Sequence, residues 1–250
     1  MSPARQHRQR VLAAKAGATA ASGLAAHSGG AASEYELLRA RLGLDLRRLH
    51  DIQSVEGKIE VKRELLPAYE AWVHGVVRGM AETGRGVDDE ILPVIMVWRI
   101  DVGDYLGALP LAAAMLRYGL ALPERYKRTP ATLICEEIAD AALKTIGQGE
   151  DFDLKILLAV EQLVDGQDIF DQVRAKLYAA LGRQLARQAA LLDDAGDGPA
   201  GGKRATIEAA VARLERARSL NANVGVKKEL DALKREAARL ADAVKDDAGA

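Results

Sequence analysis

The segment VDDEILPVIMVWRIDVGDYLGALPLAAAMLRYGLALPERYKRTP, residues 87–130, decides the fold of this chain. From Ile91 to Ile100 its apolar side chains go almost all the way round a helix. A helix at a protein surface keeps one polar side, so a helix that is apolar on every side is covered by other elements. This segment therefore predicts a central core helix.

Two short signals divide the segment into a helical hairpin. Gly103 suits the left-handed position at the end of the first helix, and Asp104 suits the N-cap of the second. The second helix carries large apolar residues with small alanines between them, and it ends at Gly119, ahead of Pro123. Pro93 lacks an N–H donor, so we expect the first helix to begin late or to kink there.

Composition favours helices that pack closely on one another. Only 4% of the 250 residues are aromatic, and alanine is frequent. With 35 basic and 36 acidic residues, any contact with a nucleic acid must come from a local patch and not from the overall charge. Cys135 is the single cysteine, which excludes an intramolecular disulfide. No apolar run is long enough for a membrane span or a signal sequence, so we expect a protein of the cytoplasm without a membrane partner.

The first 33 residues carry basic side chains and no acidic ones. Arg5, Arg8, Arg10 and Lys15 stand in a background of alanine, glycine and serine that cannot build a core. We therefore expect residues 1–33 to form a disordered basic arm. Such an arm is either a solubilising tail or a segment that contacts DNA phosphates without reading the sequence.

A heptad-like apolar seam follows the arm. Ser33 and Glu36 have the spacing of a capping box. The long helix that they begin carries six apolar side chains on one face: Tyr35, Leu38, Leu42, Leu49, Ile52 and Ile59. Asp45 and Glu56 interrupt this seam, so it either packs on its own domain or pairs subunits in a coiled coil. We assign the six apolar residues as candidates for oligomerisation.

Two further groups of basic residues are candidates for DNA contact, one after the seam and one in the proline-bounded loop at residues 123–130. They are Lys58, Lys62 and Arg63 in the first group, and Arg125, Lys127 and Arg128 in the second. In the loop, Tyr126 is placed either to stack on a base or to pack on the protein. Short basic loops are often only solvated, so both interpretations stay open.

The rest of the chain predicts more helices and a C-terminal hairpin. Helical patterns extend the core and oligomerisation domain over residues 34–193, and the glycine-rich residues 194–202 form a linker. Residues 203–245 then predict a helical hairpin. Its facing side chains are Ile207, Val211, Leu214 and Leu220 on one helix and Val226, Leu230, Leu233 and Leu240 on the other. The sequence thus predicts an all-α protein with helical hairpins around a central apolar helix.

Motifs that carry chemistry are not found. The stretch DGPAGGKR departs from a phosphate-binding loop, because Asp197 replaces the first glycine and Arg204 replaces the hydroxyl that would ligate magnesium. The four histidines have no paired spacing on one helix face, and no nucleophile lies beside a base. We therefore expect no catalytic residue, no metal and no cofactor, and so no enzyme.

Four phrases of the chain together resemble one family. The run DDEILPVIMVWRIDVGDYLGAL, with RELLPAYEAWVHGV before it and YGLALPERYKRTP and GVKKEL after it, resembles the small terminase subunits of peduovirus-type tailed phages. The resemblance is collinear over roughly residues 35–240. It implies a non-enzymatic DNA-packaging protein that acts in the cytoplasm of the host bacterium.

The resemblance also implies partners. Such a subunit recognises the cohesive-end packaging site on double-stranded phage DNA, forms a homo-oligomeric ring, and presents DNA to a large subunit that carries the ATPase and the nuclease. Some relatives end in a long basic tail, whereas this chain ends AVKDDAGA. A rival interpretation comes from GDYLGAL and AVARLERARSL, which look like the second helix of a tetratricopeptide repeat. It predicts a helical adaptor that binds a peptide of a protein partner.

Overall fold

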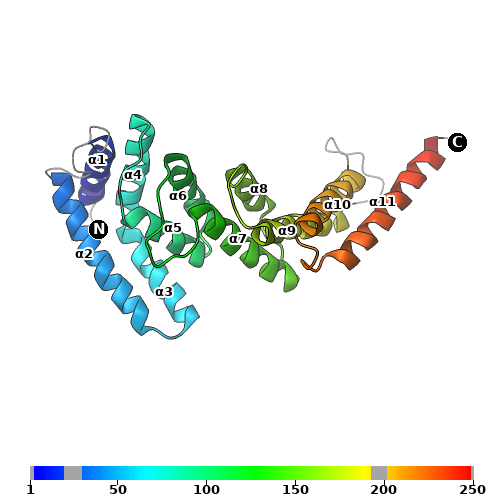
Figure 1. Ribbon diagram of the computed structural model, residues 1–250, viewed down its shortest axis with the longest axis horizontal. Coiled ribbons are helices and arrows are strands. Elements are labelled where there is room, and N and C mark those ends of the chain that lie inside the picture. Colours follow the sequence, from blue (N-terminus) through cyan, green and yellow to red (C-terminus); the bar gives the residue numbers. More distant parts are fainter. Residues whose placement is uncertain (1–2, 20–29, 193–201, 249–250) are drawn as a thin grey trace. The chain divides into compact units, whose positions relative to one another are not determined.

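The structure is a computed structural model that describes residues 3–19, 30–192 and 202–248. Within these residues every regular element is helical, with eleven α-helices, one short 3-10 helix and no strand (Figure 1). The predicted all-α fold class is confirmed. The chain divides into two compact units, Met1–Pro130 and Ala131–Ala250. This boundary differs from the predicted one, because it falls inside the single core domain expected at residues 34–193.

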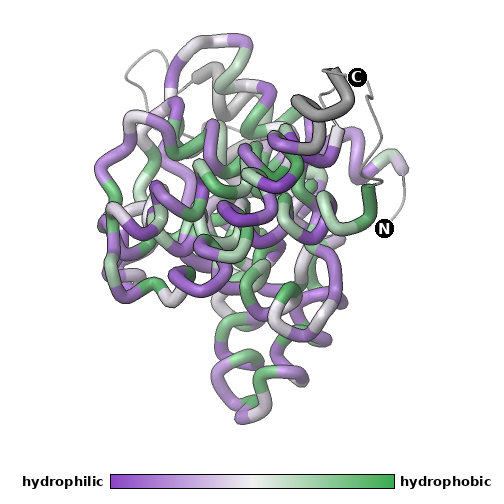
Figure 2. The backbone as a smooth tube through the Cα atoms, turned by 90° about the vertical axis from the view of Figure 1, so that its right-hand side faces the viewer, coloured by the Kyte–Doolittle hydropathy of each residue, from purple (hydrophilic) through white to green (hydrophobic). Residues whose placement is uncertain are grey.

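The described part of the first unit holds six α-helices and the 3-10 helix. They are α1 (Pro3–Thr19), α2 (Gly30–Asp51), α3 (Val55–Leu65), η2 (Leu66–Ala68), α4 (Glu70–Thr83), α5 (Ile91–Asp101) and α6 (Tyr105–Tyr118). The remaining helices are α7 (Pro130–Gly147), α8 (Leu154–Leu163), α9 (Asp171–Ala190), α10 (Gly202–Leu220) and α11 (Lys227–Ala248). Hydrophobic and hydrophilic residues alternate along the helices (Figure 2), as expected of amphipathic helices that pack within each unit.

Helix α5 is the central helix of the first unit. All ten residues from Ile91 to Ile100 are buried, the charged Arg99 among them. The sequence predicted this burial from the apolar residues on every side of the helix. Because α5 begins at Ile91, Pro93 lies in its first turn, where a missing N–H donor breaks no intrahelical hydrogen bond. The expected late start of this helix is confirmed.

The buried carboxylate of Asp89 begins α5 and ties it to two other helices. Its Oδ1 accepts hydrogen bonds from the first two backbone N–H groups of α5, at 2.9 and 2.7 Å. Its Oδ2 accepts the indole N–H of Trp72 in α4 at 2.7 Å. Tyr35 of α2 stacks on Trp72 with 5.7 Å between ring centroids, and its hydroxyl accepts the N–H of Glu90 at 3.1 Å. A single polar node therefore joins α2, α4 and α5.

Replacing Asp89 by alanine should destabilise the first unit by about 2–4 kcal/mol. A helix cap contributes roughly 1 kcal/mol, and a buried donor left without its acceptor costs about 1–3 kcal/mol. Denaturant unfolding followed by tryptophan fluorescence measures the change, since Trp72 is itself a partner of Asp89. The control is Asp88→Ala at the exposed neighbouring position, which should leave stability nearly unchanged. Equal effects of the two substitutions would contradict the role of Asp89.

Two ion pairs hold the turn between α5 and α6. Arg99 pairs with Asp104, whose side chain also caps the N-terminus of α6. Lys62 of α3 donates to a carboxylate oxygen of Asp101 at 2.5 Å, and both side chains are largely covered. Gly103 takes the left-handed conformation with φ of 81°. Helices α5 and α6 pack on each other, so the predicted helical hairpin is confirmed.

Helix α2 ends at Asp51, so the single long helix expected from Tyr35 to Ile59 is wrong. Ser54 explains the break, because it is the N-cap of α3 and its Oγ accepts the N–H of Gly57 at 3.3 Å. A serine that caps a new helix stops the previous one from continuing through it. The apolar seam therefore runs over two helices.

The first part of this seam is buried within its own unit. Four of the six predicted oligomerisation residues are buried, namely Tyr35, Leu38, Leu42 and Leu49. The other two, Ile52 and Ile59, are partly buried in the segment where α2 gives way to α3. The structure favours the interpretation in which the seam packs on its own domain over the one in which it pairs subunits in a coiled coil. The four buried side chains are not exposed to a second subunit.

Residues 3–19 form helix α1 where the sequence predicted a disordered arm. Helix α1 packs on α4, and among its described side chains those that it buries are the polar Gln9 and the small Ala13. A contact made by such residues has no apolar periodicity, which explains why the sequence did not reveal it. The prediction for residues 1–33 is therefore wrong over residues 3–19. Residues 20–29 lie outside the described part.

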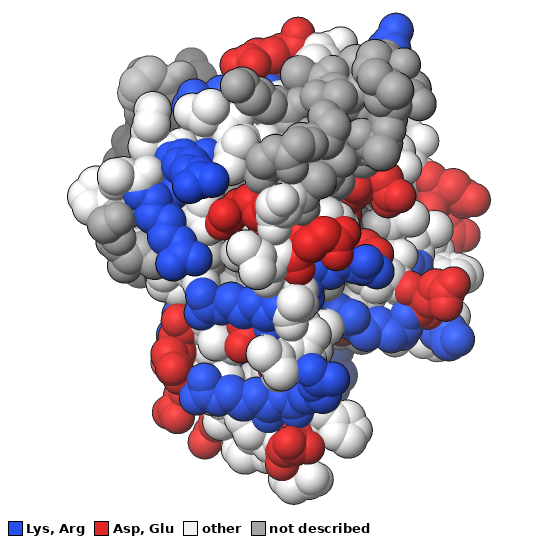
Figure 3. Space-filling view, turned by 90° about the vertical axis from the view of Figure 1, so that its left-hand side faces the viewer, with Lys and Arg blue, Asp and Glu red and all other residues white. Residues whose placement is uncertain are grey.

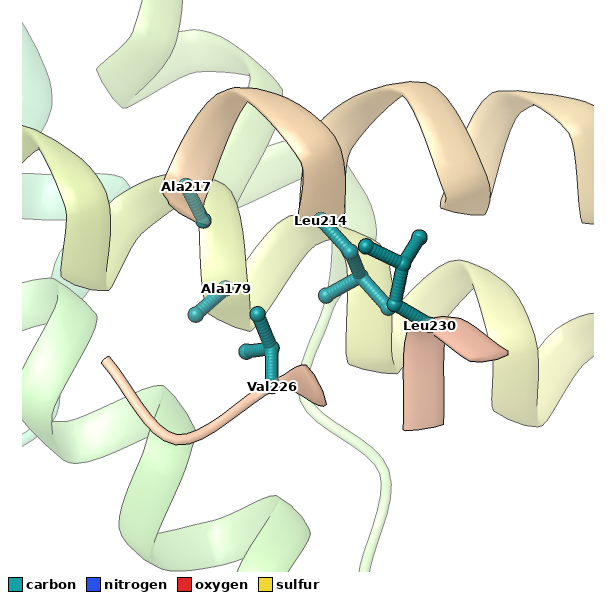
Figure 4. Close-up of a cluster of buried hydrophobic side chains, with 5 residues drawn as sticks. All are labelled: Ala179, Leu214, Ala217, Val226 and Leu230. Atoms are coloured by element: carbon teal, nitrogen blue, oxygen red, sulfur yellow. The ribbon is translucent and has the colours of Figure 1, made fainter. Parts of the chain in front are cut away.

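One apolar cluster of the second unit is built by α9, α10 and α11. Leu214 of α10 and Leu230 of α11 point toward one another beside Ala179 of α9 (Figure 4). A Cβ atom added to Gly182 of α9 would lie 2.5 Å from Cδ2 of Leu214, so α10 lies directly against the backbone of α9. The predicted hairpin of α10 and α11 is confirmed. Since α10 packs mainly on α9, this hairpin is not the separate domain expected at residues 203–245.

The predicted linker at residues 194–202 lies almost wholly outside the described residues. Residues 193–201 belong to the part that the structure does not describe, and Gly202 is the first residue of α10.

Candidate nucleic-acid interface

Helix α1 comes into direct contact with the backbone of α4 at Gly75. A Cβ atom added there would lie 2.7 Å from the carbonyl oxygen of Arg10 and would overlap the side chain of Ala13. Any other residue at this position would therefore push α1 away from α4. On the same helix, the side-chain N–H of Gln9 donates to Glu34 of α2 at 2.6 Å. These contacts place α1, and with it the basic residues of the predicted arm.

Arg10 of α1 lies beside two basic residues of α4. Arg10, His74, Gly75 and Arg78 line a cavity of about 240 Å³. Within the described part of the chain, neither Arg10 nor Arg78 has a hydrogen-bond or ion-pair partner. His74 and Arg78 are four residues apart, so they lie on the same side of α4. The cavity therefore gathers three basic side chains from two helices that are distant in sequence.

Sequence reasoning missed His74 and Arg78. The only signal for them is their spacing on the polar side of α4, next to the small residues Gly75 and Gly79. Small residues four apart on a helix let another backbone approach closely, but they do not say which segment does so. The partner became visible only when residues 3–19 proved to be helical.

The pKa of the His74 imidazole is lowered from its usual value. Partial burial contributes most, and the positive charges of Arg99 and Arg10 act in the same direction, while Glu70 opposes them. Since the ordinary pKa of histidine is about 6.5, His74 is mainly neutral at physiological pH. A bound anion would raise this pKa, because it favours the protonated imidazole.

The other predicted basic residues of α1 are placed more simply. Arg5 and Arg8 are exposed, and the side chain of Lys15 lies outside the described part. In Figure 3, basic side chains lie in short rows with acidic side chains beside them. The distribution agrees with an almost neutral chain in which positive charge is local.

The basic group on α3 is largely committed to the fold. Lys62 forms the covered ion pair with Asp101, and its side chain is only 17% exposed. Arg63 donates to the carbonyl oxygen of Val102 at 3.4 Å. In the described part of the chain, Lys58 alone of these three basic residues has no partner. This group therefore offers little free positive charge for a phosphate.

The basic loop lies beside an acidic cavity. Arg125, Lys127 and Arg128 are exposed, as predicted, and the guanidinium of Arg125 lies 4.9 Å from the ring centroid of Tyr126. The neighbouring cavity of about 920 Å³ is lined by three acidic residues of the α4–α5 segment and by Glu124. Carboxylates repel phosphate at short range. The loop is therefore a less favourable phosphate site than the cavity between α1 and α4.

The described residues show no arrangement of metal ligands. No group of three or more His, Cys, Asp or Glu side chains in this part of the chain could hold a metal ion. Nor does any described helix combine the length and the apolar character that crossing a membrane requires. Cys135 is fully buried in α7, and burial raises the pKa of its thiol to about 12. A thiol in this state is not a nucleophile at neutral pH.

The native protein should react with Ellman's reagent far more slowly at about pH 8 than after denaturation. The pKa of the Cys135 thiol is raised to about 12, so almost no thiolate is present at that pH, and the sulfur is also inaccessible. Absorbance at the wavelength of the released thiolate follows the reaction, with guanidinium-unfolded protein as the control. Rapid stoichiometric labelling of the folded chain would contradict the burial of Cys135.

Comparison with known proteins decides the family. The family model described as phage small terminase subunit matches residues 39–172. The chain belongs to the phage small terminase subunit family. It is 40% identical over 235 residues to the protein named "Terminase, endonuclease subunit" of Escherichia phage P2, with 94% of this chain and 85% of that relative aligned. No solved structure matches.

Family membership confirms the resemblance to the small terminase subunits of peduovirus-type phages, and with it a role in phage DNA packaging. The word endonuclease belongs to the name of the phage P2 relative. In the described part of this small terminase subunit, three basic residues from α1 and α4 line one cavity.

Proposed function

We propose that this small terminase subunit recognises the cohesive-end packaging site of phage DNA, assembles as a homo-oligomer, and recruits and stimulates a large subunit with ATPase and nuclease activity. It acts in the cytoplasm of the infected host. The observation that carries the proposal is the unpaired positive charge on docked α1 and on α4, in a chain whose family has a packaging role.

Electrostatics explains why this local charge matters. The formal net charge is −1, so the chain as a whole does not attract a polyanion. Affinity for DNA then requires several cations on one surface, each of which releases counterions when it neutralises a phosphate. Arg10 and Arg78 meet this requirement, because they line the same cavity and neither has an ion-pair partner within the described residues.

The docking of α1 affects how DNA binding is tested. Deleting residues 1–32 would remove Arg10 and would also uncover the face of α4 around Gly75. It would leave Glu34 without its partner Gln9. A loss of binding after deletion would therefore mix the loss of charge with a change in the fold. Substitutions of exposed basic side chains separate the two effects.

The full chain should bind a duplex that carries the packaging site more tightly than a duplex of equal length and composition without it. It should raise the ATP turnover of the purified large subunit, and alone it should hydrolyse neither ATP nor DNA. Fluorescence anisotropy, phosphate release and gel analysis measure the three properties. The affinity should fall steeply with added salt, because phosphate contacts provide most of the non-specific binding energy.

Three results would contradict this function. Equal affinity for the two duplexes would show that the chain does not recognise the packaging site. Binding of a short peptide from a protein partner, with no affinity for DNA, would instead support the tetratricopeptide-like adaptor. Hydrolysis of DNA by the chain alone, lost on replacing a carboxylate, would show that the subunit is itself an enzyme.

Assembly is supported by a second apolar face on α2. Leu37 and Leu44 are 65% and 60% exposed, and Ala40 lies between them. Their spacing of seven residues places them on one side of the helix, away from the face that carries Leu38 and Leu42 into the core. Exposed leucines at heptad spacing are suited to pairing with the same helix of another subunit.

The double substitution Leu37→Lys and Leu44→Lys should lower the mass of the oligomer in multi-angle light scattering. Both side chains are exposed, so the substitution should leave the fold of the subunit intact while it places charges in the proposed interface. The control is Leu106→Lys on α6, a leucine that is 72% exposed and lies on another helix. An unchanged mass of the double variant across a dilution series would place the subunit contacts elsewhere.

A further inference from the structure

The cavity between α1 and α4 differs from the other basic sites of this chain. Its four lining residues are Arg10, His74, Gly75 and Arg78, and none of them is acidic. Its volume of about 240 Å³ is several times the ~30 Å³ that one water molecule occupies in the liquid. The cavity therefore has room for a small hydrated anion between cationic walls.

We propose that this cavity binds a phosphate group of the DNA backbone, with Arg10 and Arg78 as its two guanidinium ligands and His74 as a third donor. The inference rests on the proposed function, because it takes the phosphate from DNA. The same chemistry would accept free inorganic phosphate, which the experiment distinguishes.

Phosphate suits the groups that line the cavity. A guanidinium presents a planar fork of N–H donors that matches two oxygens of a phosphate, and such charge-assisted hydrogen bonds are about twice as strong as neutral ones. Arg10 and Arg78 keep all their donors available, since neither has a partner within the described part of the chain. In contrast, Arg48 and Arg183 already hold both oxygens of a glutamate.

The cavity exists only while α1 is docked. Arg10 comes from α1, and its position depends on the direct contact between the α1 backbone and Gly75 of α4. Arg78 and His74 come from α4. Two residues of one helix and one of another therefore form a single site, and a phosphate bound there would bridge the two helices.

His74 should make binding depend on pH. The charged groups around it are Glu70 and Arg78 on its own helix, Arg99 on α5 and Arg10 on α1. Glu70 forms an ion pair with Arg99, with 3.7 Å between Oε1 and Nη2, and it does not line the cavity. A bound phosphate diester keeps its single negative charge through the neutral range, so binding should take up a proton at His74. Affinity should then rise as pH falls through the pKa of this histidine.

The test uses the full chain and a short fluorescein-labelled DNA duplex. The double variant Arg10→Gln with Arg78→Gln should bind about tenfold more weakly at moderate salt, because it loses two guanidinium ligands. The slope of log affinity against log salt should become shallower by about 0.9 for each occupied cavity. The matched control is Arg218→Gln with Lys228→Gln, which removes the same charge from exposed positions of α10 and α11. It should leave affinity and slope nearly unchanged.

Two further variants separate position from charge. Gly75→Leu removes no cation from the chain, but it displaces α1 and with it Arg10. It should therefore reproduce the loss of affinity. Hydrogen exchange should be faster in α1 of this variant. His74→Gln should bind with nearly the same affinity as the native chain at about pH 8, but it should lose the gain that the native chain shows at about pH 6. Circular dichroism checks that each variant keeps its helices.

The outcomes distinguish the cavity from the proposed function. If the native chain binds the duplex and the Arg10, Arg78 variant keeps its affinity and slope, the cavity does not hold a DNA phosphate, and the proposed function stands. If the native chain does not bind the duplex, the proposed function fails. In that case the cavity is tested by the thermal stability of the protein with added inorganic phosphate. A rise in melting temperature that the double variant lacks would show that the cavity binds phosphate. No rise would contradict a phosphate site there.

Discussion

The first unit depends on the hydrogen bonding of one buried carboxylate. Helix α5 is covered on all sides, so its first N–H groups have no access to water and must find acceptors within the protein. Asp89 supplies them and also accepts from Trp72, which fixes the rotation of α4 about its own axis. With Trp72 turned into the core, His74 and Arg78 lie on the outer side of α4, where α1 docks. The central helix thus determines where the cationic cavity is formed.

The distribution of ion pairs explains how a nearly neutral chain can contact DNA. Two basic side chains near the core are already paired, Arg99 with Asp104 and Lys62 with Asp101. These pairs hold turns together and leave little net field. Cations without partners remain where no acidic residue lies within reach, and the acid-free segment that precedes Glu34 creates such a place on α1. The absence of acidic residues, which suggested a basic arm, therefore still leaves basic side chains unpaired although residues 3–19 are helical.

The sequence predicted the elements that carry strong apolar periodicity. Helix α5 and the pairing of α10 with α11 followed from the spacing of large apolar residues, which buried elements must show. The docking of α1 did not, because Gln9, Ala13 and Gly75 make contact through small or polar atoms. The break before Ser54 was missed for a related reason. A seam that continues over two helices looks like one long helix when only apolar positions are compared.

The candidate site was predictable only in part, for the same physical reason. Arg10 was recognised from the local absence of acids, whereas His74 and Arg78 become site residues only through a contact between distant segments. Lys62 and Arg63 were predicted to contact DNA, but they bind partners within the chain. Lys62 pairs with Asp101 of α5, and Arg63 donates to the carbonyl oxygen of Val102 just after it. The basic run in the sequence does not reveal these partners. The sequence shows which residues are basic, and the fold determines which of them have no ion-pair partner.

Small residues at the α1 contact also affect how binding and folding are linked. Burial of apolar surface contributes roughly 25 cal/mol per Å², so a described contact that buries Ala13 and Gln9 holds α1 less firmly than leucines would. A ligand that binds only the docked form stabilises it by an amount that grows with the ratio of its concentration to its dissociation constant. An anion bridging Arg10 and Arg78 would therefore strengthen the docking of α1. By the same linkage, any substitution that loosens α1 must weaken the binding of that anion.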